Sequence, residues 1–303
     1  DERAEFPLDS TVLNAEGLFV LPGMIDAHVH ITFGCAPDPI YYLKELQSLG
    51  TIRAVANAKK MLQSGVTTIR DAGSSVYANI ALRQAIESGM VDGPRVRACG
   101  YGLCMTGGHG DTFVASHVNV DRPGLVDGPD EVRRAARYNL KMGADHIKFV
   151  SASGGVMSAG TDLGAPQFTV EEMRAGVDVA HKAGKKTMAH CHGAQGVKNA
   201  ILAGVDSIEH GTLLDDEAIE MMVKNGTFLV PTLLAPVRIA EHAESGGIPE
   251  YAIRKTKSVI EQHGMSFRNA LDAGVKIAMG TDAGTPFNMH AEVLSELPLM
   301  VRN

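Results

Sequence analysis

His28 and His30 flank Val29 at the end of an apolar stretch that begins at Phe19. In a β-strand, residues two apart project from the same face, so both imidazoles would emerge together at one end of a buried strand. Imidazole nitrogens are common ligands of zinc and other transition metals. Histidine pairs also occur for purely structural reasons, so this pair gains its meaning from residues elsewhere in the chain.

Metal-binding residue types also stand at the ends of later strand-like segments: His190, His210 and Asp282. The imidazoles of His28 and His30 could hold one ion together with the carboxylate of Asp282. The imidazoles of His190 and His210 could hold a second ion. Two-metal hydrolytic sites place their ions about 3.5–4 Å apart, and an anion between them offsets the repulsion.

Lys148 closes another strand-like segment and is the only residue placed to bridge two such ions. Its ammonium form is a poor ligand, because it is cationic and has no acceptor. A neutral Lys148 amine that reacted with carbon dioxide would become a carbamate, which is an anionic bridge on a long stem. The alternative is a structural barrel lysine that pairs with a carboxylate.

Short apolar or β-branched segments alternate with amphipathic segments along nearly the whole chain, as in repeated βα units. The predicted strands are Phe19–His30, Thr67–Asp71, Arg95–Gly100, His146–Val150, Lys186–His192, Ser207–His210, Thr227–Thr232 and Lys276–Asp282. The predicted helices are Leu46–Gln63, Ala78–Glu87, Asp130–Lys141, Thr169–Lys182, Gln195–Leu202, Asp215–Lys224 and Tyr251–Asp272. This order predicts an α/β fold, a (β/α)8 TIM barrel, with its active site at the carboxyl ends of the strands.

Helix-end signals support these boundaries. Asp130 and Thr169 are predicted N-caps, and Glu172 would complete a capping box with Thr169. Glycines follow most predicted helices, where a left-handed residue commonly ends the helix: Gly65, Gly143, Gly184, Gly204, Gly226 and Gly274.

Residues 1–18 do not fit the barrel and are assigned to the remnant of a small β domain at the N-terminus, of which Ser10–Leu18 is interpreted as the closing piece. Residues 19–303 are assigned to the barrel. Little sequence follows Asp282, and Ala291–Met300 could supply an eighth helix. This favours a barrel that is truncated at its C-terminus.

The composition excludes several classes of protein. With 45% hydrophobic and 21% charged residues, the chain of 303 residues can bury a large core. A net charge of −7 and the absence of a basic stripe argue against nucleic-acid partners. The chain contains no apolar run of about 18 residues, the length that would predict a membrane span. Four scattered cysteines favour reduced thiols, hence a cytoplasmic protein unless an N-terminal signal has been removed or is missing.

Taken together, several phrases resemble the binuclear amidohydrolase superfamily. They are His28-Val-His30, Lys148 in His-Ile-Lys-Phe-Val, His190, Ser-Ile-Glu-His210-Gly and Gly280-Thr-Asp282-Ala-Gly. Within it, the chain is most similar to metal-dependent Xaa-Pro dipeptidases and Lys/Arg carboxypeptidase-like enzymes, a group related to imidazolonepropionases. The resemblance covers about Leu18 to Pro286, and it implies that the N-terminal remnant belongs to a small β-sandwich domain.

The resemblance implies two divalent ions, expected to be Zn²⁺, and bicarbonate or carbon dioxide to carboxylate Lys148. The implied ligands are His28, His30 and Asp282 for the more buried ion, His190 and His210 for the other, and carboxylated Lys148 between them. It further implies a hydroxide nucleophile shared by the ions. Asp282 would accept its proton and pass it to the leaving amine, so that Asp282 and Lys148 are the predicted catalytic residues.

Two further histidines are predicted to contact the substrate. His109 lies in the glycine-rich phrase Met105-Thr-Gly-Gly-His-Gly-Asp111, which could fold closely over a ligand. His192 shares a strand face with His190 and lies one step nearer the mouth of the barrel. Arg70, at the end of the second strand, is expected to form a salt bridge that organises this mouth.

The predicted function is metal-dependent hydrolysis of an amide bond in a small molecule by a metal-bridging hydroxide. The expected substrate is the peptide bond of an Xaa-Pro or C-terminal Lys/Arg dipeptide, or an N-acyl amino acid. A homo-oligomer is expected. One alternative is a cyclic amidohydrolase, such as a dihydroorotase or an imidazolonepropionase; Lys148 argues against the latter. Another is an inactive barrel that serves as a binding module, against which the complete ligand set argues. The sequence leaves the metal and the substrate side chain open.

Overall fold

The computed structural model describes residue 7 and residues 9–111, 114, 117–118, 123–244 and 246–303. Its strands are all paired in parallel, in a three-stranded sheet of β1 to β3 and a five-stranded sheet of β4 to β8. They are β1 (Met24–Val29), β2 (Val66–Asp71), β3 (Arg95–Ala98), β4 (His146–Phe149), β5 (Lys186–Gly193), β6 (Ser207–Leu213), β7 (Phe228–Val230) and β8 (Lys276–Ile277).

Backbone contacts join the two sheets at both edges. Val29 at the end of β1 bridges Ala283, which follows β8. On the other side, Leu103 beyond β3 bridges Phe149 in β4. The strands therefore follow one another around a (β/α)8 barrel, and the predicted fold class is confirmed.

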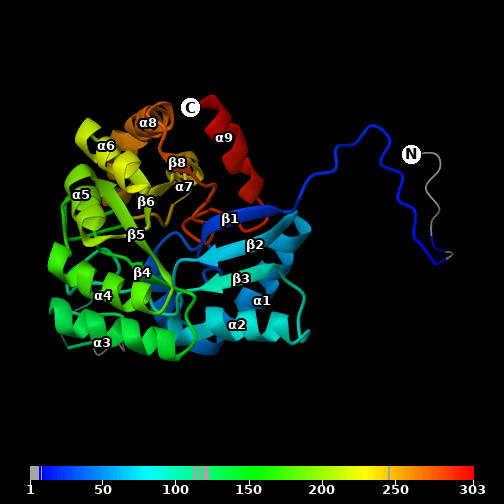
Figure 1. Cartoon of the computed structure of the whole chain (residues 1–303), viewed down its shortest axis with the longest axis horizontal. Coiled ribbons are helices and arrows are strands. Elements are labelled where there is room, and N and C mark those ends of the chain that lie inside the picture. Colours follow the sequence, from blue (N-terminus) through cyan, green and yellow to red (C-terminus); the bar gives the residue numbers. More distant parts are fainter. Residues whose placement is uncertain (1–6, 8, 112–113, 115–116, 119–122, 245) are drawn as a thin grey trace.

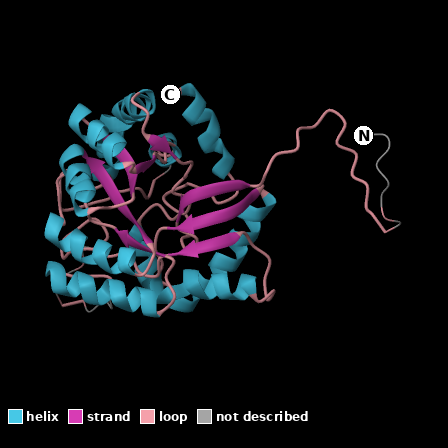
Figure 2. Ribbon diagram, viewed as in Figure 1, coloured by secondary structure: helices cyan, strands magenta, loops and turns pink. Residues whose placement is uncertain are grey.

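The helices lie outside the strands (Figures 1 and 2). They are α1 (Gln47–Gln63), α2 (Ala78–Glu87), α3 (Gly128–Lys141), α4 (Val170–Lys182), α5 (Ala194–Ala203), α6 (Asp216–Asn225), α7 (Leu234–Glu241), α8 (Glu250–Asp272) and α9 (Glu296–Arg302). Short 3₁₀ turns add η1 (Pro39–Lys44), η2 (Ser75–Tyr77) and η3 (Val293–Ser295). Within the described ranges, no helix combines the length and apolar character needed to cross a membrane.

Most predicted helices match these bounds, and α7 is the exception. Its first turn contains Pro236. Proline is tolerated in the first turn of a helix but disrupts a helix interior, so the sequence around it did not predict a helix. The helix predicted near Ala291–Met300 is α9, which begins later, at Glu296.

The helix ends explain which cap predictions hold. The Thr169 hydroxyl accepts the Glu172 N–H, and the Glu172 carboxylate accepts the Thr169 N–H, so the predicted capping box is present. The N-cap prediction for Asp130 is wrong. Helix α3 begins earlier, with Asp127 as N-cap and a proline in the first turn, and the Asp130 side chain pairs with Arg133.

The glycines predicted to end helices all adopt the left-handed conformation, with φ from 66° at Gly226 to 103° at Gly143. Any other residue would be strained at this backbone angle. Each helix therefore stops where its glycine allows the chain to reverse into the next strand.

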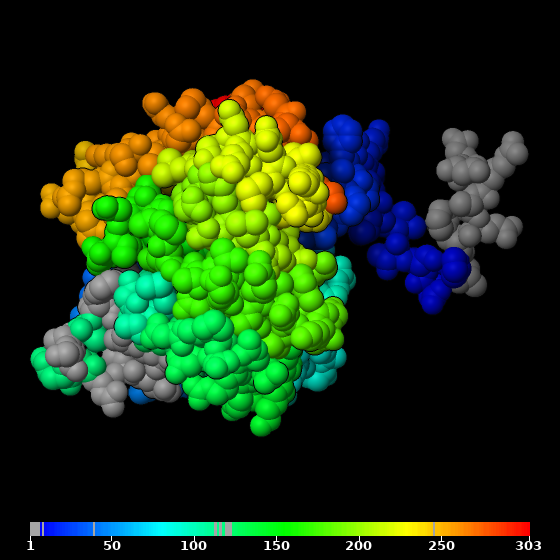
Figure 3. Space-filling view, turned by 60° about the vertical axis from the view of Figure 1, so that its left-hand side comes forward, coloured from blue at the N-terminus to red at the C-terminus, as the bar shows by residue number. Residues whose placement is uncertain are grey.

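The segment before β1 stands away from the barrel (Figure 3). Its described residues form no strand, and the side chains of Leu13 and Phe19 are 85% and 94% exposed. The predicted start of the first strand at Phe19 is therefore wrong: pairing with β2 begins only at Met24, after Pro22, which lacks an N–H donor. Residues 1–6 and 8 lie outside the described residues, and the β-sandwich remnant remains a prediction.

Two clusters of buried apolar side chains fill the space between strands and helices. The larger includes Phe149 of β4 and Ile208 of β6, and the smaller includes Ile69 of β2. All four cysteines are buried and none forms a disulfide, as the prediction of reduced thiols requires. The packed clusters give the strand ends a rigid base.

Replacing Thr169 with Ala should lower the free energy of unfolding by about 1 kcal/mol, because the Glu172 N–H in the first turn of α4 loses its acceptor. Urea unfolding followed by circular dichroism would measure the change. Thr169→Ser keeps the hydroxyl and serves as the control. Equal stability of Thr169→Ala and the parent chain would show that the cap contributes nothing.

Candidate metal centre

The carboxyl ends of the strands bring potential ligands together in two overlapping groups. Within the described residues, one group holds His28, His210 and Asp282, and the other holds His190, His192 and His210. In each group the ligand atoms lie within 4.8 Å of one another. His210 belongs to both, since its ring centroid is 5.0 Å from that of His28 and 4.5 Å from that of His190.

Asp282 provides the anionic oxygen of the centre. Its Oδ1 atom lies 3.3 Å from the Nε2 atoms of both His28 and His30. Burial opposes ionisation, but the neighbouring imidazoles, that of His28 above all, hold the pKa of Asp282 well below its usual range. The carboxylate therefore carries a negative charge where the strands converge.

Two buried polar atoms of the centre have no hydrogen-bond partner in the described part of the chain: Asp282 Oδ1 and His190 Nε2. Leaving such atoms unpaired is costly, so native proteins satisfy them with protein groups, water or ions. Both atoms are electron-pair donors of the kind that a divalent metal accepts. The residues present therefore fit a metal.

Hydrogen bonds fix the tautomers of two histidines. His28 Nδ1 lies 2.7 Å from Glu209 Oε2 and must donate, because a carboxylate only accepts. His210 Nδ1 lies 2.7 Å from Thr232 Oγ1, whose own proton goes to the Pro231 carbonyl, so His210 donates as well. In both rings Nε2 is left with a free lone pair, as a metal ligand requires.

Glu209 is a buried residue of the candidate centre that sequence reasoning missed. It is fully buried, and Arg70 Nη2 donates to its Oε1 at 2.8 Å. Burial opposes its ionisation, but Arg70 and His28 lower the pKa of Glu209 to about 2. The predicted salt bridge of Arg70 is thus found, and its partner stands directly before His210 in the quoted phrase.

Lys148 is 2% exposed at the end of β4. Burial lowers the pKa of its amine, against the opposing charges of Glu209 and Asp282. A lowered pKa enriches the neutral amine, which is the form that reacts with carbon dioxide. The environment of Lys148 is therefore compatible with carboxylation.

His30 is held more loosely than the other histidines. Its Nδ1 lies 3.4 Å from the Gly73 carbonyl oxygen, and its ring stacks on Phe33 with centroids 4.9 Å apart. The side chain is 17% exposed. His30 thus lies at the more open side of Asp282.

His109 and His192 both lie beside the ligand cluster. The His109 ring stacks on His190 at 3.8 Å, and its Nδ1 is 2.8 Å from Ser158 Oγ. The His192 ring lies 4.7 Å from that of His190, and its Nδ1 is 2.7 Å from Thr212 Oγ1. Burial lowers the pKa of His109 to about 4 and that of His192 well below its usual value, so both rings are neutral near pH 7.

The loop after β4 closes over these rings and needs a glycine there. A Cβ atom on Gly155 would lie 2.7 Å from both His109 Cε1 and His190 Nε2. The loop is held from α8, where the Tyr251 hydroxyl donates to the Met157 carbonyl and Lys255 donates to two further loop carbonyls. Helix α8 therefore holds the loop that covers the candidate centre.

The backbone is strained at the centre. His210, Thr232 and Asp282 have φ angles of 72°, 52° and 60°, in the left-handed region that side chains other than glycine rarely adopt. Such strain often accompanies functional sites, where the surroundings enforce a geometry that the residue alone would not adopt.

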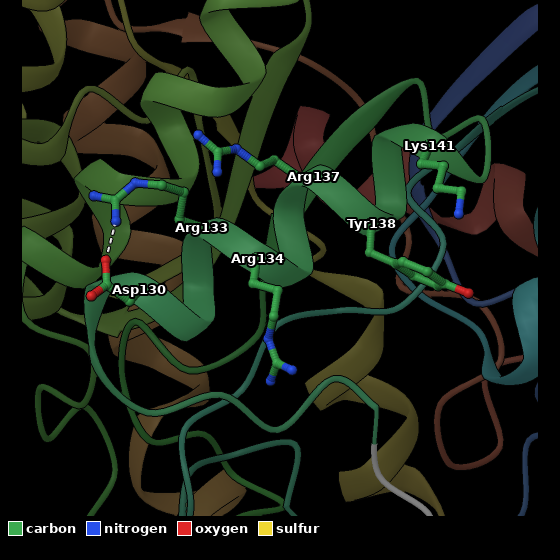
Figure 4. Close-up of a pocket in the computed structure, with 6 residues that line it drawn as sticks. All are labelled: Asp130, Arg133, Arg134, Arg137, Tyr138 and Lys141. Carbon is green, nitrogen blue, oxygen red and sulfur yellow. Dashed lines mark hydrogen bonds and ion pairs between the residues drawn. The ribbon is translucent and has the colours of Figure 1, made fainter.

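A hollow of about 370 Å³ on the outer face of α3 lies apart from the candidate centre. It is lined by Asp130, Arg133, Arg134, Arg137, Tyr138 and Lys141. Figure 4 shows that its basic groups do not converge on one point, and none of the predicted ligands lines it. This hollow therefore shares no residue with the candidate centre.

Replacing Glu209 with Gln should weaken zinc binding about 10- to 100-fold, because the amide has no charge and only one acceptor oxygen to share between His28 and Arg70, so the tautomer of His28 is held less firmly. Competition with a chromophoric chelator would measure the affinity. Glu45→Gln removes one charge from an Arg–Glu pair with Arg53 outside the ligand cluster and should leave the affinity unchanged. Equal affinity of Glu209→Gln and the parent chain would remove Glu209 from the metal centre.

Comparison with known proteins identifies the family. The amidohydrolase family model matches residues 19–302. Ochratoxinase from Aspergillus niger is 34% identical over 286 residues, which cover 87% of this chain and 58% of that protein. The chain thus spans less than two thirds of the length of ochratoxinase.

Solved structures give the same result. A Xaa-Pro dipeptidase with methionine bound in its active site is 41% identical, with a TM-score of 0.86, covering 93% of this chain and 70% of that one. A prolidase in complex with N-methylphosphonate-L-proline is 34% identical, with a TM-score of 0.89 and coverages of 99% and 74%. The chain belongs to the amidohydrolase family, as the motifs at its strand ends predicted.

Proposed function

We propose that this chain is a metal-dependent hydrolase that cleaves an amide bond, in a dipeptide of the Xaa-Pro or C-terminal Lys/Arg type or in an N-acyl amino acid. The observation that carries the proposal is the convergence of histidine Nε2 atoms on the charged Asp282 carboxylate in a buried site. The names of the relatives, Xaa-Pro dipeptidase and prolidase, support a substrate with a peptide bond.

The proposed centre holds two divalent ions, for which the nitrogen and oxygen donors favour zinc. The proposed ligands are His28, His30 and Asp282 for one ion, His190 and His210 for the other, and carboxylated Lys148 for both. When bound, the ions supply Lewis-acid activation of water and of the scissile carbonyl. The two orphaned acceptors, His190 Nε2 and Asp282 Oδ1, support this assignment.

Asp282 is the proposed general base and acid. Its carboxylate is ionised and nearly buried, and is therefore ready to accept a proton from water and to deliver it to the leaving amine. The left-handed backbone at Asp282 and its neighbouring imidazoles hold the carboxylate in one place. A fixed position matters, because both proton transfers require hydrogen-bond distance.

His109 and His192 are the proposed substrate contacts. Both are neutral imidazoles that pack against His190, and each has its Nδ1 occupied by a hydroxyl group. Their Nε2 atoms are then the groups that can bond a substrate carbonyl or carboxylate.

Protein prepared with bicarbonate should contain about two equivalents of zinc per chain, and Lys148→Ala should lose the second equivalent together with turnover. Metal content would be measured by plasma mass spectrometry, and turnover on panels of dipeptides, N-acyl amino acids and cyclic amides. Short carboxylic acids should partly restore activity by filling the bridge. Lys198→Ala, at an exposed ion pair on α5, is the matched control and should keep both ions.

The outcomes separate the competing functions. Full activity of Lys148→Ala would refute the bridging role. A single ion together with turnover of cyclic amides would favour the cyclic amidohydrolase. A folded chain without metal or turnover would favour the binding module.

Asp282→Asn should lower kcat by about 100-fold or more and change KM little, because the amide cannot accept the proton. Steady-state kinetics on the best dipeptide, at saturating zinc, would separate the two constants. A variant that is impaired mainly in KM would make Asp282 a binding residue instead.

A further inference from the structure

Glu296 is a buried carboxyl group that lies outside the proposed ligand set. It is on α9 and is fully buried. Its Oε1 accepts the N–H of Leu233 at 2.8 Å, and its Oε2 accepts the N–H of Leu234 at 2.7 Å. Burial raises the pKa of Glu296 to about 8, although these N–H donors lower it, because burial disfavours the ionised carboxylate.

The two N–H groups lie at the junction between β7 and α7. Helix α7 is short, and its N-cap residue, Leu233, has no side chain that can accept a hydrogen bond. The first N–H groups of a helix have no partner within the helix and need acceptors from elsewhere. Glu296, more than sixty positions later in the chain, supplies acceptors that the local sequence lacks.

Thr232 directly precedes this junction. Its φ angle of 52° is an outlier for a β-branched residue, and its side chain is fully buried. A strained backbone persists only where its neighbours over-determine it. Because Glu296 holds the next two N–H groups, it fixes the backbone on the C-terminal side of Thr232.

Thr232 in turn orients His210. Its hydroxyl accepts the proton of His210 Nδ1 at 2.7 Å and donates to the Pro231 carbonyl. His263 on α8 donates to the backbone carbonyl of His210 at 3.0 Å. Thr232 thus orients the ring of His210, and His263 holds its backbone carbonyl.

We propose that Glu296 is a positioning residue of the centre: by holding the Leu233 and Leu234 N–H groups, it keeps Thr232 in the conformation that orients His210. The C-terminal helix α9 is thereby part of the machinery that presents His210 Nε2. The inference rests on the proposed function only where it concerns metal affinity, since the orientation of His210 can be observed without metal.

The test compares Glu296→Gln with Glu292→Gln. Glu292 lies on the same C-terminal segment and also contacts α7, through an ion pair with Arg238 at 2.7 Å, but its side chain is 48% exposed. In metal-free protein, ¹⁵N NMR of the His210 imidazole should show the Nδ1–H tautomer in the parent chain and in Glu292→Gln. In Glu296→Gln it should show a mixture of tautomers.

Zinc affinity is the second readout. Glu296→Gln should weaken the binding of one ion about 10-fold or more, as expected for a lost supporting contact of a ligand, while Glu292→Gln leaves it unchanged. Thr232→Val removes the hydroxyl at nearly constant shape and should cause the same loss. The double variant should lose no more than either single variant, because both changes act on one contact chain.

The outcomes are distinct. Unchanged His210 tautomers and zinc affinity in Glu296→Gln, with only a lower Tm, would overturn the inference and leave Glu296 a structural cap. If Glu296→Gln does not fold, normal tautomers and affinity in Thr232→Val would overturn it equally. A parent chain that binds no zinc would overturn the proposed function, while the tautomer measurement would still decide the role of Glu296.

Discussion

The buried carboxylate of Glu209 is the interaction on which the centre depends. It joins three strands, because Arg70 comes from β2, His28 from β1 and Glu209 itself from β6. A buried charge without partners would be strongly destabilising, so the strands must approach closely enough to pair it. The same pairing sets the tautomer of His28. The same contacts therefore pair the buried charge of Glu209, which folding requires, and fix the tautomer of His28 that the proposed metal site requires.

Near this contact, residues with a strained backbone are held by hydrogen bonds from the surrounding helices. His210 and Asp282 adopt left-handed backbone conformations that their residue types disfavour, and the helices behind them supply the compensation. His263 on α8 bonds the carbonyl of His210, and Lys255 on the same helix bonds the loop above the rings. The outer helices thus do more than cover the barrel: they hold its rim in conformations that the rim would not adopt alone.

The sequence predicted the local features well. Strand ends and helix-ending glycines such as Gly204 depend on neighbouring residues, and local patterns carry that information. Helix α7 was missed because Pro236 in its first turn predicts a helix end, and the Glu296 carboxyl group that accepts the N–H groups at its start lies far away in the chain. The first strand was begun too early at Phe19, because an apolar run does not reveal where pairing with β2 starts. The candidate ligands could be found because parallel strands present their carboxyl ends at one face. Their supporting partners, such as Thr232, could not, since those contacts exist only after folding.

His210 belongs to both groups of ligand atoms, and this overlap has a consequence for how the centre fills. The free Nε2 atom of an imidazole has a single lone pair and can serve one ion at a time. In the proposed assignment that nitrogen serves the ion of His190, and His30 takes its place beside His28 and Asp282. A displacement of the His210 ring would still disturb both groups, because the ring packs against His28 as well as against His190.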